Sequence, residues 1–454
     1  MNTRPTGSLT PEDLAGALAR LQETNADLAR AFPGEIGDRQ PVHTVYGGAH
    51  LFKSDTAVRL GRLAVAALNE YAPDGETLAR VLDLDPALDP AGLRARVAEK
   101  LEREPVEDFR IDFEDGYGNR SDADEDGHAV STANEVAAGA RAGTLPPFIG
   151  IRIKPMSREL HVRGLRTLDI FVSTLAEATG GQLVPGLVIT VPKVMAAGQV
   201  EAVAEVCDAL ERKHRLAADS LKLELMIETP QSIFAADGSS ALRRLVDAGG
   251  GRVTGAHFGT YDYTALCGIT AAWQHMRHQA CDFAKHMMQV ALAQSGVHLS
   301  DGATNIMPIA LHRSAKGGTL TAQQQRENAE SVHRAWKVHF DDVMHSLVNG
   351  YYQGWDLHPA QLPTRYAAVY AFFLSALPAA TERLRNFVDK AAQATLAGDV
   401  FDDAATGQGL LNFFIRGLSS GALTADEAAA TGLTNEELQT RSFVAILEAR
   451  RRPA

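Results

Sequence analysis

Eight strand-like runs alternate with helical segments along this chain, and this alternation limits the fold more than any other feature. The runs cover residues 42–48, 109–114, 148–155, 186–194, 221–230, 252–260, 296–302 and 354–359. Strands that alternate with helices are typical of a parallel sheet covered by helices. Eight of them favour a closed (β/α)8 barrel, a TIM barrel, while the strand number alone leaves an open doubly wound sheet as the alternative.

Helical segments flank the predicted barrel. Thr10 is followed by Pro11, Glu12 and Asp13, which is typical of a capped helix start, and this helix is expected to end near 32–34. Beyond the last strand-like run the pattern is helical, with no further strand. We therefore expect an N-terminal helical segment over 1–40, a TIM-barrel catalytic domain over 41–365 and a helical C-terminal extension over 366–454.

The charge balance and the cysteines limit the partners and the compartment. The chain has 44 Lys and Arg against 56 Asp and Glu, a formal net charge of −12. Neither nucleic acid nor an anionic membrane is therefore expected as a partner. The sequence has no apolar run of about 18 residues and no signal-peptide pattern. Its three cysteines form no CxxC pair, which suits a reducing compartment. We expect a soluble, cytoplasmic protein.

Three of the strand-like runs carry a charge on alternate residues. The charged sets are Arg110, Asp112 and Glu114 in the second run, Arg152 and Lys154 in the third, and Lys222, Glu224 and Glu228 in the fifth. In a parallel barrel the apolar face of a strand meets helices, so the charges are expected inside, where they must pair. Active sites lie at the carboxyl ends of barrel strands. This position selects Glu114, Lys154 and Glu228, with Arg152 one layer below.

Two carboxylates at the ends of neighbouring strands predict a divalent-cation site. Glu228 ends the fifth run in "MIETP", and Asp262 follows the sixth in "HFGTYDYTALCG". Two carboxylates that leave positions open suit Mg²⁺ or Mn²⁺. Arg152 beside them would hold a substrate carboxylate, and metal and guanidinium together would stabilise an enolate, the intermediate in carbon–carbon bond making or breaking. An internal ion-pair plug is the alternative for these charges.

Six motifs resemble, in order and at comparable strand positions, those of the citrate lyase beta subunit and related metal-dependent aldolases. They are "RIDFEDGYG", "IRIKP", "VPKV", "LMIETP", "HFGTYDYTALCG" and "WDLHPAQ", within about 43–365. The resemblance implies a TIM barrel whose Mg²⁺ is held by Glu228 and Asp262. It also implies that Arg152 contacts the substrate carboxylate or enolate oxygen. Glu114 and Asp115 would lie near the waters of the metal, and the protein would be a homo-oligomer.

The sequence departs from these relatives at two strand ends. Arg152 is followed by "IKP", where the relatives usually have an asparagine two places on, so Lys154 is expected to alter the substrate contacts. "VYGGAHLFK" stands where the relatives have a proline-glycine turn, which places His50 near the mouth as a candidate substrate-binding residue. The general base is unassigned, with His43, His50 and a metal-bound water as candidates.

These observations predict a Mg²⁺-dependent carbon–carbon lyase that cleaves or condenses a small 2-oxo acid or hydroxy acid, or its acyl-CoA thioester, by aldol or Claisen chemistry. Malate synthases are similar in site design, so an acyl-CoA condensing enzyme is one alternative. A second is a Schiff-base aldolase that uses Lys154 or Lys193. A third, from another class, is a barrel without turnover that binds ligands or regulates a partner. The sequence leaves the exact substrate and the direction of the reaction open.

Overall fold

Eight parallel strands close into a barrel in chain order, from β1 to β8 and back to β1. The structure is a computed structural model that describes residues 8–34, 39–314, 318–389, 395–397, 400–402 and 404–451. The strands are β1 (His43–Gly48), β2 (Asp108–Asp112), β3 (Phe148–Arg152), β4 (Leu187–Val191), β5 (Lys222–Ile227), β6 (Val253–Phe258), β7 (His298–Ala303) and β8 (Gln353–Asp356). The closed barrel confirms the predicted TIM fold and rules out the open sheet.

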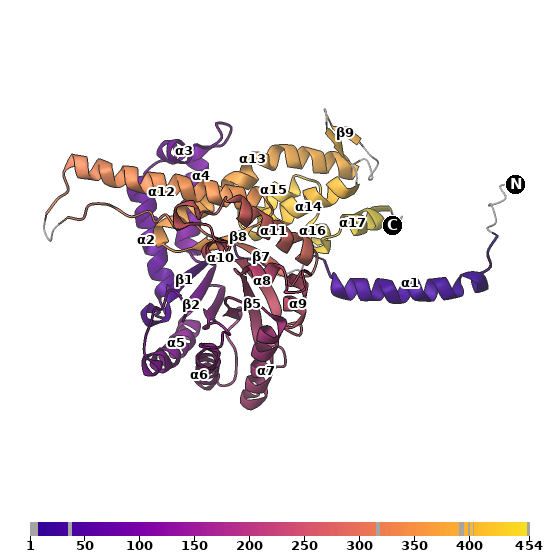
Figure 1. Cartoon of the computed structure of the whole chain (residues 1–454). Helices are drawn as coiled ribbons and strands as arrows, with labels where there is room; N and C mark the ends of the chain where they lie inside the picture. The colour runs from indigo at the N-terminus through magenta and orange to yellow at the C-terminus, as the bar shows by residue number, and fades with distance from the viewer. Residues whose placement is uncertain are drawn as a thin grey trace.

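Helices follow the strands and surround the barrel (Figure 1). They are α2 (Thr56–Tyr71), α3 (Gly75–Leu82), α4 (Pro90–Arg103), α5 (Asp122–Ala142), α6 (His161–Thr179), α7 (Ala197–His214), α8 (Pro230–Ile233), α9 (Leu242–Asp247), α10 (Thr260–Leu266), α11 (Gln279–Leu292) and α12 (Ala322–Val348), with short turns η1 (Ala49–Leu51), η2 (Ala271–Trp273) and η3 (Pro359–Gln361). Both α3 and α4 lie between the first two strands. Among the described helices, none has the length and apolar character needed to cross a bilayer.

Alternate residues along the strands face opposite sides of the barrel wall, with apolar side chains toward the helices and charged side chains toward the barrel interior. Ile111 of β2 and Ile151 of β3 are fully buried in the hydrophobic core that joins strands and helices. Arg110 and Asp112 alternate with them and point into the barrel, and Asp112 lies in register with Arg152 on β3. This is the arrangement that period-two alternation predicts for a strand covered on both faces.

The N-terminal helix α1 (Pro11–Ala31) stands apart from the barrel. It begins as predicted, with a capping box in which the Asp13 amide donates to Thr10 Oγ1 (3.2 Å) and the Thr10 amide donates to Asp13 Oδ2 (2.9 Å). No residue of this helix is buried. Figure 1 shows α1 extending away from the rest of the molecule.

The chain after the barrel is mainly helical. It comprises α13 (Leu362–Asp389), α14 (Ala404–Ser419), α15 (Ala425–Ala429), α16 (Asn435–Thr440) and α17 (Phe443–Arg451). One difference from the predicted all-helical extension is a short antiparallel pair, β9 (Thr395–Ala397) with β10 (Val400–Asp402). The extension is tied to the barrel side by Arg96 of α4, whose Nη2 lies 2.6 Å from Glu427 Oε1 of α15.

Candidate active site at the carboxyl end of the barrel

Charged side chains from five consecutive strands meet at the carboxyl end of the barrel. This mouth cluster consists of Asp112, Glu114 and Asp115 at and after the end of β2, Arg152 at the end of β3, Lys193 after β4, Glu228 after β5 and Asp262 in α10 after β6. It combines two cations with five carboxylates. The carboxyl end is the face on which TIM-barrel enzymes keep their active sites.

Arg152 is held rigidly in this cluster. Its Nε and Nη2 donate to the two carboxylate oxygens of Asp112 at 2.7 and 2.5 Å, and Nη1 lies 3.1 Å from Glu114 Oε2. Burial alone would lower the pKa of Arg152, but Asp112 and Glu114 raise it, so the group stays cationic. The bidentate contact fixes the guanidinium plane and leaves Nη1 on the side of Glu114.

The turn after β2 orients the carboxylate that holds Arg152. The amides of Glu114 and Gly116 donate to the two oxygens of Asp112, at 3.0 and 2.7 Å. Each Asp112 oxygen therefore accepts one hydrogen bond from the turn and one from the guanidinium. Sequence reasoning placed Asp112 inside the barrel but did not assign it to the site.

Two aromatic rings form the floor under Arg152. Tyr46 of β1 and Trp355 of β8 stack with their ring centroids 4.4 Å apart. The guanidinium carbon of Arg152 lies 4.8 Å from the Tyr46 centroid and 5.9 Å from that of Trp355, within the range of cation–π attraction. Sequence reasoning missed both rings, although each occupies an inward position on a strand.

Lys193 lies among the carboxylates of the mouth. Its ammonium donates to Glu114 and lies 3.2 Å from Asp115 Oδ2. It is also 3.5 Å from Asp262 Oδ2. Burial alone would lower the pKa of Lys193, but Glu114 and Glu228 raise it, so the amine is protonated. Sequence reasoning considered Lys193 only as a Schiff-base candidate and missed this contact with the acids.

The backbone at Lys193 also contributes to the site. Its φ of 51° is in the left-handed region, which is uncommon for a residue with a side chain. In this conformation its amide donates to Glu228 Oε1 at 2.8 Å while its ammonium reaches the acids after β2. A residue in a sparsely populated backbone region is typical of functional sites.

Glu228 is a buried carboxyl with a strongly shifted pKa. Burial, with a further contribution from Asp262, raises its pKa to about 8, although Lys193 and Arg152 act in the opposite direction. A Cβ atom on Gly259 would lie 2.4 Å from Glu228 Oε2, so the glycine at that position makes room for the carboxyl group. The metal-free carboxyl is therefore largely protonated at neutral pH.

The donors at the mouth fit a hard divalent cation. Glu228 and Asp262 offer only carboxylate oxygens, and Mg²⁺ is usually bound by one or two carboxylates together with waters or substrate oxygens. The raised pKa of Glu228 indicates too little positive charge around this carboxyl. An added cation would lower that pKa, so these residues suit Mg²⁺ or Mn²⁺.

One other acidic group resembles a metal site. Within the described part of the chain, Asp208, Glu211 and Asp219 have ligand atoms within 4.8 Å of one another. Arg252 lies among them, with Nη1 at 2.7 Å from Glu211 Oε1 and Nη2 at 3.3 Å from Asp219 Oδ1. A guanidinium therefore already lies among these ligand atoms.

Lys154 lies apart from Arg152. Its ammonium donates to the Phe113 carbonyl at 2.8 Å and lies 3.2 Å from Glu125 Oε2 on α5. The strand β3 ends at Arg152, so the alternation that predicted an inward Lys154 does not extend to it.

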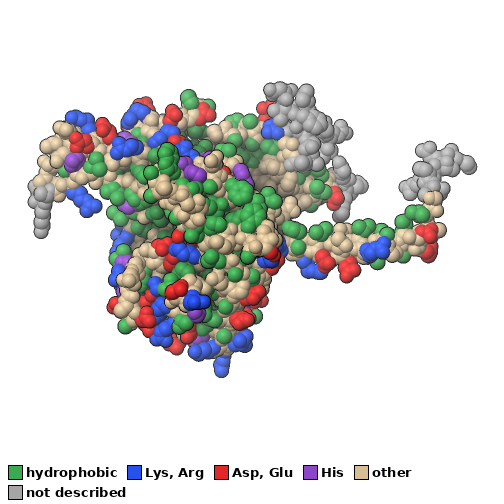
Figure 2. All heavy atoms as spheres, in the orientation of Figure 1, with side chains coloured by type: hydrophobic (Ala, Val, Ile, Leu, Met, Phe, Trp, Pro, Cys, Tyr) green, Lys and Arg blue, Asp and Glu red, His purple; other side chains and the backbone are tan. Residues whose placement is uncertain are grey.

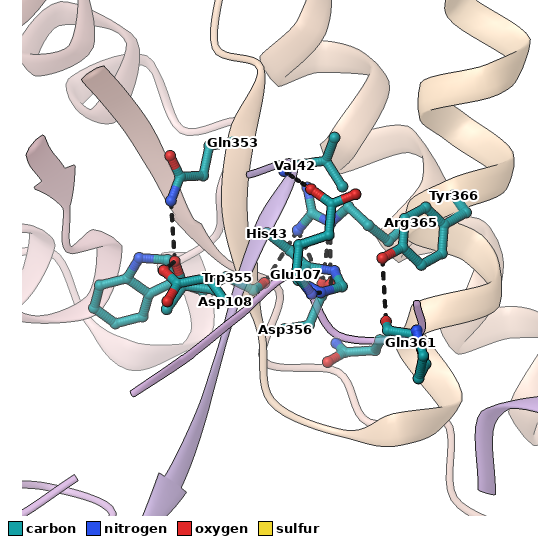
Figure 3. A network of polar contacts seen from close by, with 12 residues as sticks. Val42, His43, Glu107, Asp108, Gln353, Trp355, Asp356, Gln361, Arg365 and Tyr366 are labelled. Carbon is teal, nitrogen blue, oxygen red and sulfur yellow. Dashed lines mark hydrogen bonds and ion pairs between the residues drawn. The ribbon is translucent and has the colours of Figure 1, made fainter. Parts of the chain in front are cut away.

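The two candidate histidines, His50 and His43, contact residues outside the mouth cluster. The ring of His50 lies 5.7 Å from that of Tyr117, and burial lowers its pKa, which keeps it neutral. His43 is fully buried outside the barrel wall, with Nδ1 3.0 Å from Asp356 Oδ2. Figure 3 shows His43 and Asp356 beside Arg365 of α13. This burial excludes His43 as a general base at the mouth.

A second set of polar and charged side chains points into the barrel below the rings of Tyr46 and Trp355. This lower layer consists of Asp108, Arg110, Thr190, Glu224 and His257, all buried. Arg110 lies 2.7 Å from Asp108 Oδ1, 2.6 Å from Glu224 Oε2 and 2.9 Å from Thr190 Oγ1. A Cβ atom on Gly150 would come within 3.0 Å of Arg110 Nη1. The lower layer is thus an internal ion-pair network, and it is formed by other residues than Glu228, Asp262 and Arg152.

A family model covers most of the chain. The model described as "Domain of unknown function (DUF6986)" matches residues 21–446. No curated protein matches the sequence.

Several solved structures are similar to this chain. A citrate lyase from Burkholderia xenovorans LB400 is 18% identical, with a TM-score of 0.53 over 88% of this chain and 99% of that chain. A malate synthase from Haloferax volcanii is 15% identical, with a TM-score of 0.48 over 91% of this chain and 98% of that one. An HpcH/HpaI aldolase/citrate lyase family protein from Burkholderia cenocepacia J2315 is 11% identical, with a TM-score of 0.37 over 80% and 99%. The first likeness shows a shared fold.

Proposed function

Because the chain belongs to the DUF6986 family, whose description states no reaction, we propose its function from the geometry of the mouth. We propose a Mg²⁺-dependent carbon–carbon lyase or condensing enzyme that acts on a small 2-oxo acid or hydroxy acid. One observation carries the proposal: at the carboxyl end of a TIM barrel, a fixed, buried guanidinium lies close to Glu228, a buried carboxyl whose raised pKa indicates too little positive charge around it. The sequence motifs shared with the citrate lyase beta subunit agree with it.

Arg152 is the proposed anchor for the substrate carboxylate and the carbonyl oxygen beside it. Asp112 takes one N–H each from Nε and Nη2, and Glu114 lies beside Nη1, which leaves further N–H bonds of Nη1 and Nη2 for a substrate oxygen in a fixed plane. The rings of Tyr46 and Trp355 close one side of the guanidinium and exclude water from it. A preorganised donor of this kind stabilises negative charge that develops on a substrate oxygen.

Glu228 and Asp262 are the proposed ligands of the divalent cation. When bound, the cation would supply positive charge that stabilises an enolate. Cation binding requires the deprotonated form of Glu228, so loading releases a proton from this buried carboxyl.

Glu114 and Asp115 are proposed to orient water and substrate next to these ligands. Both contact Lys193, which neutralises part of their charge and holds Glu114 close to Arg152. Lys154 and His50 remain proposed substrate contacts only at the edge of the site, since each packs beside α5. A 2-oxo acid, a hydroxy acid and their acyl-CoA thioesters all fit this division of roles.

A Schiff-base mechanism at Lys193 is less consistent with the geometry. An amine that attacks a carbonyl must be neutral, whereas the acids around Lys193 raise its pKa. Activity that survives EDTA, together with borohydride trapping of a lysine in the presence of pyruvate, would contradict the metal-dependent mechanism.

Thermal-shift binding of small 2-oxo acids, with and without Mg²⁺, tests the proposal. We expect pyruvate or glyoxylate to raise the melting temperature of the wild type only when Mg²⁺ is present. Glu228→Gln should lose this dependence, because an amide binds Mg²⁺ more weakly than a carboxylate. Glu159→Gln makes the same chemical change on an exposed side chain after β3 and should behave as the wild type.

Binding without metal that is unchanged in Glu228→Gln would contradict the proposed site. If ligands bind with Mg²⁺ but no oxo acid, hydroxy acid or acyl-CoA thioester is turned over, the barrel is a binding protein and the catalytic proposal fails.

A further inference from the structure

Helix α1 leaves an apolar stripe uncovered. Its large apolar side chains and the one that follows it are 38 to 55% exposed: Leu14 38%, Leu18 52%, Leu21 55%, Leu28 51% and Phe32 43%. Figure 2 shows apolar side chains along the projecting helix and on the body near its base. A helix that touches little else is marginally stable in water. A stripe of this size therefore indicates a partner.

The spacing of the stripe is that of a coiled coil. Leu14, Leu21 and Leu28 are seven residues apart, and Leu18, Asn25 and Phe32 alternate with them at steps of four and three. These six residues occupy the d and a positions of a heptad repeat over three heptads. Leucine at d is typical of parallel two-stranded coiled coils, and a single asparagine at an a position specifies register and oligomer state.

The charges of α1 agree with pairing between identical helices. All six charged residues fall on the outer b, c and f positions: Glu12, Asp13, Arg20, Glu23, Asp27 and Arg30. The e and g positions that flank the seam are uncharged: Ala15, Gln22 and Ala29, and Ala17, Thr24 and Ala31. Two copies can therefore approach without like charges facing each other.

The base of α1 is fixed to the body beside another apolar surface. Arg243 Nη1 donates to the Ala31 carbonyl at 3.1 Å, and the Gly34 amide donates to the Gln294 carbonyl just after α11 at 3.0 Å. On the neighbouring elements, Phe234 is 41%, Phe283 50% and Val290 79% exposed. In a parallel pair the two-fold axis runs along the helices, so the two bodies lie at the same end. The exposed surface of Phe234, Phe283 and Val290 would then lie next to the same surface of the second copy.

We propose that α1 is a dimerisation arm and that two copies of this chain pair their α1 helices in parallel as a short coiled coil. Leu14, Leu21 and Leu28 form the d layers. Leu18 and Asn25 form the a layers, Phe32 follows the end of the helix, and the paired Asn25 side chains set the register. The occupant of the stripe is the same helix of a second copy, and the proposal is independent of the reaction at the barrel mouth.

Sedimentation of the full chain over a concentration series tests the arm. We expect the wild type to be a dimer. Leu21→Lys should raise the dimer dissociation constant by about 100-fold or more, because each dimer loses two seam leucines and places two like charges face to face. Ala26→Lys adds the same charge at an outer b position and should stay dimeric. A monomeric wild type, or a dimer unaffected by Leu21→Lys, would overturn the proposal.

Disulfide trapping distinguishes parallel pairing from other uses of the stripe. Cys267 is exposed, whereas Cys207 and Cys281 are buried, so the variants carry Cys267→Ser. With oxidised glutathione, Leu14→Cys should form a disulfide-linked dimer, because position 14 lies near one end of α1 and meets its own copy only in a parallel pair. Ala26→Cys, on the outer face, should not. A dimer in which Leu14→Cys does not cross-link would show antiparallel pairing or docking of α1 on the partner's body, and would overturn the parallel arm.

Discussion

The lower layer and the mouth cluster are built on the same strands. Arg110 and Asp112 lie two residues apart on β2, and Glu224 and Glu228 lie four residues apart at β5. In the lower layer, Arg110 contacts both of its acids directly, and His257 Nε2 lies 3.0 Å from Glu224. At the mouth, five carboxylates share two cations, and among the described residues Glu228 accepts its hydrogen bond from the backbone amide of Lys193.

The pKa values of the two β5 glutamates express this difference. Burial opposes ionisation of both, but Arg110 and His257 lower the pKa of Glu224, whereas the pKa of Glu228 rises to about 8. A buried carboxyl with a matched cation is a structural ion pair. A buried carboxyl without a matched cation has a raised pKa, and perturbed pKa values of this kind are characteristic of ligand or cofactor sites.

Removal of the central arginine of each layer should separate the two roles most strongly. Arg110→Met leaves Asp108 and Glu224 buried without their cation, which should cost about 3–5 kcal/mol in the free energy of unfolding. Arg152→Met should cost less, because Asp112 keeps the amides of Glu114 and Gly116 as donors and Glu114 keeps the Lys193 ammonium. Urea unfolding of both variants measures the difference.

Ligand binding completes this test. Arg152→Met should abolish the Mg²⁺-dependent binding of 2-oxo acids, whereas any folded Arg110→Met protein should still bind them. Equal losses of stability in the two variants would mean that the mouth cluster is a second plug.

The pH dependence of stability should distinguish the two glutamates next. For metal-free protein in EDTA, folded Glu228 keeps its proton up to about pH 8, whereas in the unfolded chain it ionises near the ordinary value for glutamate. Within that window the folded state binds more protons, so stability falls as pH rises, by at most about 1.4 kcal/mol per pH unit. Glu228→Gln removes this contribution and should become more stable than the wild type toward pH 8.

Mg²⁺ provides the internal control for this prediction. It binds the ionised carboxylate and should therefore flatten the fall in stability of the wild type, with little effect on Glu228→Gln. If the stability of the wild type in EDTA does not fall as the pH rises from the ordinary glutamate pKa to about 8, the raised pKa of Glu228 is wrong.

The fold was predictable because its signal repeats along the chain. Eight runs with helices between them, and alternating charge in Arg110, Asp112 and Arg152, each follow from burial on both faces of a strand. The β9–β10 pair was not predictable in this way, because its two strands have three residues each and carry no periodic signal.

The site was predictable only where residues lie on regular strands. Arg152 and Glu228 follow from the alternation, whereas Lys193 depends on a left-handed backbone conformation that no local pattern announces. Lys154 was expected to point into the barrel from the same alternation, but β3 ends at Arg152, so the alternation does not apply to it. The Tyr46–Trp355 floor depends on contact between the first and last strands, which only barrel closure brings together.

Substitution at Tyr46 should have the smallest effect on stability and binding. Because Tyr46 lies between the mouth cluster and the lower layer, it tests whether the boundary between them supports the site. Its hydroxyl makes a weak contact, 3.9 Å from Met226 Sδ, so Tyr46→Phe should change the free energy of unfolding by less than about 0.5 kcal/mol. Tyr46→Leu removes the ring under Arg152 and should cost about 1–2 kcal/mol in stability and in oxo-acid binding. If Tyr46→Leu binds the ligand as the wild type does, Asp112 alone fixes the guanidinium, and the aromatic floor separates the layers without supporting the site.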